Sequence, residues 1–309
     1  MILLENEPMC KHTTFRVGGP ARYFAKIENT DDLKAALALA QEKEIPFFIL
    51  GNGSNLLVAD KGYNGIVMTL AGKFSKIEDF GNGVFKVGAA VPLGRFARAA
   101  LKQGFAGIHK LAGIPGTLGG ALFMNAGAYG QEIGTCCTSV ATIDTEGHLR
   151  ERPASECGFG YRQSIFQKGI PDQAGDGIHQ EIILSAAFQL PTAESEGKSA
   201  AVLETELAEC MAKRKATQPL SMPNAGSTFK RLEKGAAETP AQIAPGYYIE
   251  QAGLKGFRIG GAEVSTLHAN FIVNAGGATA ADILALCDYV QKKVAERFGI
   301  ELKREIVIL

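Results

Sequence analysis

Two glycine-rich segments contain the residue types that could do chemistry. The first is Gly51, Asn52, Gly53, Ser54 and Asn55, which directly follows an apolar run. Glycines let successive backbone N–H groups turn toward one point and bind an anion, and the serine and asparagine side chains add further donors. A turn between two strands explains the segment equally well. The residues alone therefore leave both an anion site and a simple turn open.

Two common nucleotide-binding patterns are excluded by single residues. The dinucleotide pattern G-x-G-x-x-G begins at Gly51 but needs a glycine where Leu56 stands. The P-loop pattern ends at Gly197, Lys198 and Ser199 but needs its first glycine where Thr192 stands. Neither an ordinary NAD-binding fold nor a P-loop is therefore expected.

The second glycine-rich segment covers residues 112–130, where glycines alternate with apolar residues. A flexible linker would be polar instead. Small residues let the backbone approach a phosphate or a flat ring such as an isoalloxazine. Tight packing of a helix on a sheet is the alternative, and it would explain Gly119, Gly120 and Ala121 on its own.

Composition excludes several classes of protein. The 309 residues hold 32 basic and 32 acidic side chains, and a chain without basic excess is a poor candidate for nucleic-acid binding. The six cysteines include no C-x-x-C pair and no zinc-ligand spacing, so no metal is expected. The same cysteine usage indicates a reducing, cytoplasmic setting. The N-terminus does not resemble a signal peptide, and no apolar run is long enough for membrane insertion.

Helices and strands are both expected, without strict alternation, which indicates an α+β fold. Loop-like composition marks residues 171–179 and 191–199, and the main domain boundary is placed in the second stretch. The clearest helix begins at a capping-box pair, Thr279 with Asp282, and ends at Gly299. Other helices are expected over 30–44, around 96–101 and around 203–211, and strands over 47–50, 66–70, 84–87, 140–144, 182–190, 271–274 and 306–309.

The two glycine-rich segments resemble the loops of the FAD-binding domain of the vanillyl-alcohol-oxidase (PCMH) type. Further segments narrow the resemblance: residues 12–21 (HTTFRVGGPA), 160–166 (GYRQSIF), 224–231 (NAGSTFKR), 252–256 (AGLKG) and 259–265 (IGGAEVS). In this order the set resembles the UDP-N-acetylenolpyruvoylglucosamine reductase family of peptidoglycan synthesis, from about residue 12 to residue 309. The interval between the 160–166 and 224–231 segments contains no tyrosine, which resembles the compact class of that family, lacking a tyrosine loop.

The resemblance implies a domain organisation and a reaction. Residues 1–195 would bind FAD in two subdomains, about 1–72 and 73–195. Residues 200–300 would form a smaller α+β substrate-binding domain, and the strand of residues 301–309 would return to the FAD-binding domain. NADPH would reduce FAD, held non-covalently, which would reduce the enolpyruvyl ether of a UDP-sugar to UDP-N-acetylmuramate. A monomer without nucleic-acid partners is expected.

The resemblance also assigns catalytic roles. Ser227 would protonate the carbon that becomes electron-rich, and Arg162 and Glu305 would stabilise charge at the substrate carboxylate. Arginine suits a carboxylate because its planar fork binds in bidentate fashion, whereas Glu305 would have to be protonated in order to donate. Taken singly, Ser227 would more often be a turn hydroxyl or a helix cap, Arg162 a surface charge and Glu305 part of a charged surface cluster. The family pattern has arginine where Val307 stands, which puts the pairing of Glu305 in doubt.

Binding roles are carried over in the same way. The substrate diphosphate would meet Lys213, Lys230 and Arg231, with Arg214 a further candidate. His109 lies near the region where some fold relatives attach flavin covalently, but no such link is expected. The FAD-binding residues would be Gly51, Asn52, Gly53, Ser54, Asn55, Ile114, Pro115, Gly116, Thr117, Gly119, Gly120, Asn125, Ala126 and Gly127.

Two alternatives stay open from the sequence. One is an FAD-dependent alcohol oxidase or dehydrogenase of the same fold, which would not need Ser227. The other is a nucleotide-binding module without catalysis, which the replacement at Val307 makes conceivable.

Overall fold

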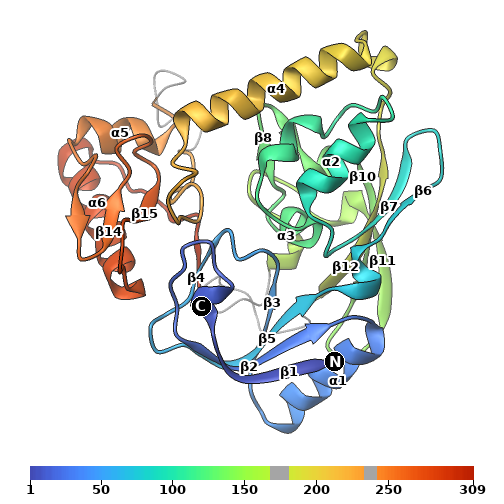
Figure 1. The fold of residues 1–309 in the computed structure, drawn as a ribbon, viewed down its shortest axis with the longest axis horizontal. Coiled ribbons are helices and arrows are strands. Elements are labelled where there is room, and N and C mark those ends of the chain that lie inside the picture. The colour runs from blue at the N-terminus through green and yellow to red at the C-terminus, as the bar shows by residue number, and fades with distance from the viewer. Residues whose placement is uncertain (168–180, 233–241) are drawn as a thin grey trace. The chain divides into compact units, whose positions relative to one another are not determined.

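The computed structural model describes residues 1–167, 181–232 and 242–309 and shows a mixed α+β chain (Figure 1). The loop-like stretch 171–179 lies outside these residues. Contacts divide the chain into two compact units. Unit 1 comprises residues 1–4, 23–52 and 65–213, and unit 2 comprises residues 5–22, 53–64 and 214–309. The predicted division by function, with a boundary near residues 195–200, stays a prediction beside this division by contacts.

A four-stranded sheet uses the first third of the chain. Its order is β1 (Ile2–Pro8), β2 (Pro20–Ile27), β5 (Tyr63–Leu70) and β3 (Phe47–Leu50), with β3 parallel to β5. Helix α1 (Thr30–Glu42) begins where the Asn29 side chain accepts the Asp32 N–H. The apolar face of α1 packs with strand residues such as Ile27 and Ile66, all fully buried, in one core. The expected helix and strands are confirmed here, whereas β1 and β2 were not expected.

A five-stranded antiparallel sheet forms the rest of the unit 1 framework. Its order is β11 (Leu149–Pro153), β10 (Cys137–Ile143), β12 (Ile182–Gln189), β7 (Val84–Gly88) and β6 (Ile77–Asp79). Helices α2 (Leu93–Leu101) and α3 (Leu118–Phe123) share its core. The Phe96 ring lies 5.7 Å from Phe85 and 5.0 Å from Phe188 between centroids, so aromatic packing joins α2 to β7 and β12.

Helix α4 (Ala200–Thr217) buries only Leu203 completely, so apolar packing alone does not hold it. A polar cluster does this instead. The Glu206 carboxylate lies 2.9 Å from the Nε2 of the fully buried His109, 2.8 Å from Lys198 Nζ and 3.2 Å from Lys110 Nζ. A buried imidazole needs a polar partner, and α4 supplies it.

Unit 2 is built around helix α6 (Ala280–Phe298). The predicted capping box at Thr279 and Asp282 is present, and Gly299 ends the helix with φ +67°. Asp60 adds a second cap, because its two carboxylate oxygens accept the Ala280 and Ala281 N–H groups. The sheet beside α6 is β13 (Arg258–Ile259), β14 (Ala262–Val264) and β15 (Ile272–Asn274), with α5 (Pro245–Gln251) on the same core.

Segments far apart in sequence complete unit 2. The last strand, β16 (Val307–Ile308), pairs in parallel with β4 (Leu56–Leu57). Phe15, Val17 and Leu57 are buried in the same core as the apolar face of α6. The C-terminal part of the chain is therefore packed around residues from the first sixty.

Several short elements connect these parts. No helix among the described residues is long and apolar enough to cross a bilayer. The short hairpin is β8 (Gly127–Ala128) with β9 (Gln131–Glu132), and single 3₁₀ turns cover Met9–Lys11, Gly72–Ser75, His109–Gly113, Ile133–Cys136, Ala154–Glu156, Ile165–Gln167 and Glu194–Glu196.

Candidate flavin and substrate site

The loop at residues 51–55 has the features of an anion nest. Among the described residues, no protein acceptor pairs with the backbone N–H groups of residues 52–55. Gly53 has φ +60°, and a Cβ there would lie 2.1 Å from the His12 carbonyl oxygen, so only glycine fits. Unpaired N–H groups on a close-packed glycine turn suit the oxygens of a diphosphate. The geometry thus favours the anion site over a simple turn.

Within unit 1, Gly51 lies close to Thr117, which belongs to the second glycine-rich segment. A Cβ at Gly51 would lie 2.7 Å from Thr117 Oγ1. Thr117 is the N-cap of α3, where its hydroxyl accepts the Gly120 N–H. The loop after β3 and the start of α3 therefore come together where the glycine pattern places the FAD diphosphate.

The glycines of α3 have different reasons to be small. At Gly119 a Cβ would lie 3.0 Å from Ala89 Cβ, while its N–H donates to the Ala89 carbonyl, so tight packing explains this residue. Gly120 is exposed, and the nearest atom to a Cβ there would be Thr117 Oγ1 at 3.6 Å. Packing does not explain Gly120, which leaves the backbone open to a ligand.

A second cluster joins Arg162 to residues 125–127. Arg162 Nη2 donates to the Gly127 carbonyl at 3.1 Å. The buried Asn125 donates from Nδ2 to the Gly160 carbonyl at 2.9 Å and accepts the Gly134 N–H at 3.0 Å. Asn125 and Arg162 both have positive φ, at +41° and +53°, which is uncommon for residues other than glycine. Two residues with strained backbone conformations, both held by hydrogen bonds to other segments, are typical of a preorganised site.

The turn around Arg162 is fixed from its C-terminal side as well. The Gln167 Nε2 donates to the Arg162 carbonyl at 3.0 Å and to the Phe123 carbonyl at 2.9 Å. The Arg162 guanidinium lies 5.2 Å from the centre of the Tyr161 ring. The structure therefore brings Arg162 to the residues expected near the flavin ring system.

Ser227 follows a turn in unit 2. The Asn224 side chain accepts the Gly226 N–H at 2.9 Å, and Gly226 has φ +78°. Thr228 and Phe229, directly after Ser227, are almost completely buried, whereas Ser227 is partly exposed. The turn thus leaves Ser227 partly exposed beside two almost completely buried residues.

Glu305 lies beside this segment through backbone pairing. Its N–H donates to the Thr228 carbonyl at 2.8 Å, and the Lys230 N–H donates to the Lys303 carbonyl at 2.8 Å. The Asn55 side chain donates to the Glu305 carbonyl at 3.1 Å, and the Val307 N–H donates to the Asn55 carbonyl at 2.9 Å. One ladder therefore connects the neighbour of Ser227, Glu305 and the end of the glycine loop.

Thr14 is a functional candidate that sequence reasoning missed. Its hydroxyl donates to the Asn224 carbonyl at 2.6 Å and lies 3.3 Å from the Gly53 carbonyl, which also accepts the Thr14 N–H. Thr14 thus links the glycine loop to the turn before Ser227. The residues 12–21 were part of the family pattern, but no signal in one sequence assigns this contact.

The remaining predicted binding residues are divided between α4 and the segment that follows Ser227. Lys213 belongs to unit 1 and Arg214 to unit 2, on consecutive positions of α4. Arg231 is exposed, and Lys230 is partly buried in the ladder described above. These positions do not conflict with a role in binding a diphosphate, which remains a prediction.

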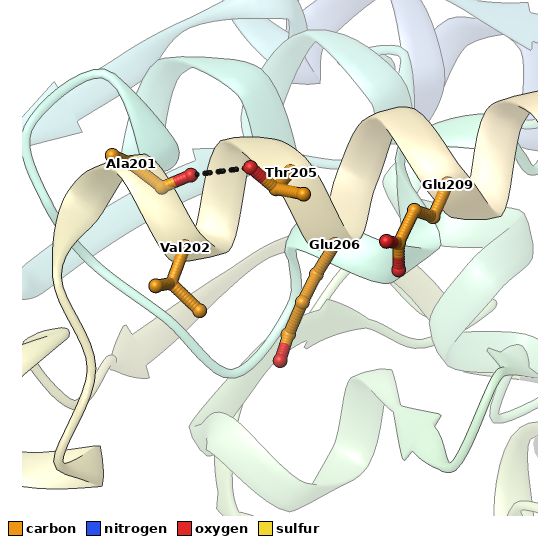
Figure 2. A pocket seen from close by; sticks show the side chains of 5 residues that line it. All are labelled: Ala201, Val202, Thr205, Glu206 and Glu209. Atoms are coloured by element: carbon orange, nitrogen blue, oxygen red, sulfur yellow. Dashed lines mark hydrogen bonds between the residues drawn. The ribbon is translucent and has the colours of Figure 1, made fainter.

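A shallow hollow of about 380 Å³ runs along α4 and is lined by Ala201, Val202, Thr205, Glu206 and Glu209 (Figure 2). None of these five is a predicted site residue. Figure 2 shows two carboxylates, Glu206 and Glu209, projecting from this face. Because no predicted binding residue lines this hollow, it is a poor candidate for the site.

Comparison with known proteins defines first the class and then the family. Residues 21–152 match the model of an FAD-binding domain, so the glycine loops belong to a flavoprotein. Residues 218–309, which contain Ser227 and Glu305, match the C-terminal domain of UDP-N-acetylenolpyruvoylglucosamine reductase. The expected PCMH-type FAD-binding domain followed by a reductase C-terminal domain is confirmed.

Full-length relatives agree with both matches. The UDP-N-acetylenolpyruvoylglucosamine reductase of Heliobacterium modesticaldum is 41% identical over 99% of this chain and 90% of its own. That of Caldanaerobacter subterraneus is 41% identical over 98% of this chain and 92% of its own. The crystal structure of the Thermus caldophilus reductase (MurB) superposes with a TM-score of 0.78 at 32% identity, over 99% of this chain and 98% of that one. The chain belongs to the UDP-N-acetylenolpyruvoylglucosamine reductase family, whose members are flavoenzymes of peptidoglycan precursor synthesis.

Proposed function

We propose that the protein reduces UDP-N-acetylenolpyruvoylglucosamine to UDP-N-acetylmuramate, with Ser227 as the proton donor. FAD, when bound, would take a hydride from NADPH and deliver it to the enolpyruvyl double bond. The electron pair of that bond moves to the carbon beside the carboxylate. A proton from Ser227 Oγ then completes the saturated ether, and the serine recovers its proton from solvent.

The observation that carries this proposal is the backbone ladder at Ser227. It joins the segment after Ser227 to Glu305 and, through Asn55, to the glycine loop. The predicted donor, the predicted carboxyl group and a predicted FAD-binding residue are thus neighbours within unit 2. A serine is a weak acid, so it can protonate only a strongly basic carbon at short range. A serine whose neighbouring backbone is fixed by hydrogen bonds suits that task.

Arg162 and Glu305 have complementary roles in the proposal. Arg162 offers a guanidinium fork to the substrate carboxylate, where charge develops as the hydride adds. Glu305, when protonated, donates to the same oxygens. Residues 51–55 and 114–120 would hold the FAD diphosphate and residues 125–127 would lie at its ring system. His109 is fully buried against Glu206, which supports non-covalent binding of FAD.

Further parts of the proposal concern the substrate and its setting. Lys213, Lys230 and Arg231 would bind the UDP diphosphate, and the enzyme would belong to the compact class without a tyrosine loop. Because both NADPH and UDP-sugars are metabolites of the cell interior, we place the reaction in the cytoplasm.

The test separates the two half-reactions of the FAD-loaded enzyme. Anaerobic mixing with NADPH should bleach the flavin absorbance at the same rate in the native enzyme and in Ser227→Ala. Adding UDP-N-acetylenolpyruvoylglucosamine should restore the colour quickly in the native enzyme and at least a hundredfold more slowly in the variant.

Other outcomes have distinct meanings. Equal recovery of colour in Ser227→Ala would refute the proton-donor role. A native enzyme that bleaches but ignores this substrate, yet oxidises alcohols, would favour the alternative flavoenzyme. A native protein that binds no FAD would contradict the assignment of both glycine loops.

A further inference from the structure

Asn270 lies in the connection between β14 and β15 and is 5% exposed. A buried side-chain amide needs partners for its oxygen and for its nitrogen. Neither partner of Asn270 is a side chain. Both are backbone groups of Phe229, two residues after the proposed proton donor.

Three hydrogen bonds fasten the Ser227 segment to Asn270. The Asn270 Oδ1 accepts the Phe229 N–H at 3.1 Å, and its Nδ2 donates to the Phe229 carbonyl at 2.9 Å. The Asn270 carbonyl accepts the Thr228 N–H at 2.8 Å. The Asn270 side chain thus pairs with the Phe229 backbone as a strand partner would.

The orientation of the Asn270 amide is fixed by this chemistry. An N–H must meet the amide oxygen and a carbonyl must meet the amide nitrogen, so the reversed amide would lose both bonds. Asn270 is itself held, because its N–H donates to His268 Nδ1 at 3.2 Å. The Thr228 hydroxyl adds a parallel link by accepting the Ile272 N–H at 3.2 Å.

We propose that Asn270 is a positioning residue for proton transfer: its amide clamps Phe229 and thereby aims the Ser227 hydroxyl at the substrate carbon. The inference rests on the proposed role of Ser227 but adds a residue that role does not require. Ser227 lies between Gly226, which has φ +78°, and the clamped pair Thr228 and Phe229. The clamp therefore fixes the position of Ser227 from its C-terminal side, as the Asn224 turn does from its N-terminal side.

Loosening the clamp should affect one half-reaction only. Proton transfer depends steeply on the donor–acceptor distance, and a misplacement of about 1 Å can cost roughly a hundredfold in rate. Flavin reduction by NADPH uses no proton from Ser227. In the FAD-loaded enzyme we expect Asn270→Ala to slow substrate-dependent flavin reoxidation roughly tenfold to a hundredfold, and to leave NADPH-dependent bleaching unchanged.

A double-mutant cycle separates positioning from a general structural role. If Asn270 acts through Ser227, adding Asn270→Ala to Ser227→Ala should slow reoxidation no further. The matched control is Asn274→Ala, because Asn274 donates to the Phe15 carbonyl and accepts the Gly276 and Ala278 N–H groups. That control removes three side-chain hydrogen bonds from the same unit, one more than Asn270→Ala removes, without touching residues 227–229, and reoxidation should stay near the native rate.

A second variant guards against loss of folding in Asn270→Ala. Thr228→Val keeps the side-chain shape but removes the oxygen that accepts the Ile272 N–H, so it should slow the same half-reaction by a smaller factor. Native-rate reoxidation in both Asn270→Ala and Thr228→Val would overturn the inference, as would full additivity with Ser227→Ala. If Ser227→Ala itself reoxidises at the native rate, the proton-donor proposal fails instead.

Discussion

Gly51 shows how one absent methyl group can shape a cofactor loop. Its backbone lies so close to α3 that a Cβ would come within 2.7 Å of Thr117 Oγ1. That oxygen caps α3 by accepting the Gly120 N–H, so the extra methyl would push the cap aside. The two loops that we assign to the FAD diphosphate would then separate.

We therefore expect Gly51→Ala to weaken FAD binding roughly tenfold, which corresponds to about 1.4 kcal/mol. The measurement is a titration of flavin-free protein with FAD, followed by absorbance and fluorescence. Gly246→Ala is the control, because its new Cβ would have its nearest neighbours at an ordinary 3.5 Å. Unchanged FAD affinity in Gly51→Ala would argue against a diphosphate site formed jointly by the loop at Gly51 and the start of α3.

Thr14 gives a second prediction at the residue scale. Thr14→Val should lower the free energy of unfolding by about 1–2 kcal/mol, because the Asn224 carbonyl loses its donor while the side-chain shape is kept. Urea unfolding followed by circular dichroism measures this. The matched control is Thr205→Val, which removes a hydrogen bond of 2.9 Å to the Ala201 carbonyl on the exposed face of α4 (Figure 2). Equal losses in the two variants would deny Thr14 any special role.

Residue roles were only partly predictable from the sequence. The pattern around Ser227 identifies a candidate, but its neighbour Glu305 reaches it through pairing across a long sequence separation. The contacts of Thr14, Asn224 and Asn270 are side chain to backbone, and such bonds leave no periodic signal. Gly119 is a further example, because one sequence cannot distinguish a packing glycine from a ligand-binding one.

Elements with local signals were predicted well. The helix over 280–298 has its capping box and its terminal glycine within its own sequence, and both are present. The short α3 was not predicted, since Gly119 and Gly120 have low helix propensity and its stability comes from the surrounding core. The edge strand β1 was also missed, because its exposed Leu-Leu-Glu-Asn-Glu run lacks a buried face.

Helix α4 depends on charge rather than on apolar burial, which gives a prediction with a pH dependence. Hydrogen bonds from Lys198 and then His109 lower the pKa of Glu206 to about 2. The buried His109 has a lowered pKa because of desolvation, and its Nδ1 faces the Gln131 amide nitrogen at 3.3 Å. The neutral imidazole therefore accepts at Nδ1 and donates from Nε2 to Glu206.

A depressed carboxyl pKa contributes stability above about pH 4.5, and this contribution is lost as the pH falls toward 2. Glu206→Gln should therefore lower the free energy of unfolding at pH 7 by about 1.5–3 kcal/mol, toward the lower end because water screens part of the cluster. The difference from the native protein should shrink below pH 4.5. Denaturant unfolding at several pH values measures it.

Glu209→Gln is the comparison for this prediction. Glu209 lines the same face of α4 (Figure 2) but lies outside the cluster at His109, so its replacement should change stability by less than about 0.5 kcal/mol. A Glu206→Gln difference that persists undiminished at pH 3 would contradict the ionic account.

For the whole molecule, the main surprise is that the contact-based units are interleaved along the chain. Apart from the returning strand of residues 301–309, sequence reasoning placed the domains as continuous ranges, because composition shifts are read in order. The core of unit 2 instead takes Phe15, Val17 and Leu57 from the N-terminal part. Long-range burial of this kind has no local sequence signal.

A fragment of residues 200–309 should therefore not fold by itself. It contains α6 and its sheet but lacks those three core side chains and the β4 partner of β16. We expect no cooperative thermal transition and weak dispersion of its amide NMR signals, with the full chain as reference. A sharp, reversible transition in the fragment would show that the N-terminal residues are dispensable for this core.

The pairing of β16 with β4 also bears on how the polypeptide is made. The Leu309 N–H donates to the Leu57 carbonyl, and the Leu309 carbonyl accepts the Ala59 N–H. A ribosome releases residues 55–59 long before residue 309 leaves its exit tunnel. During that interval β4 lacks this strand partner, and a nascent chain arrested before residue 307 could not form the pairing. Release of residues 307–309 from the ribosome is thus a physical precondition for pairing β16 with β4.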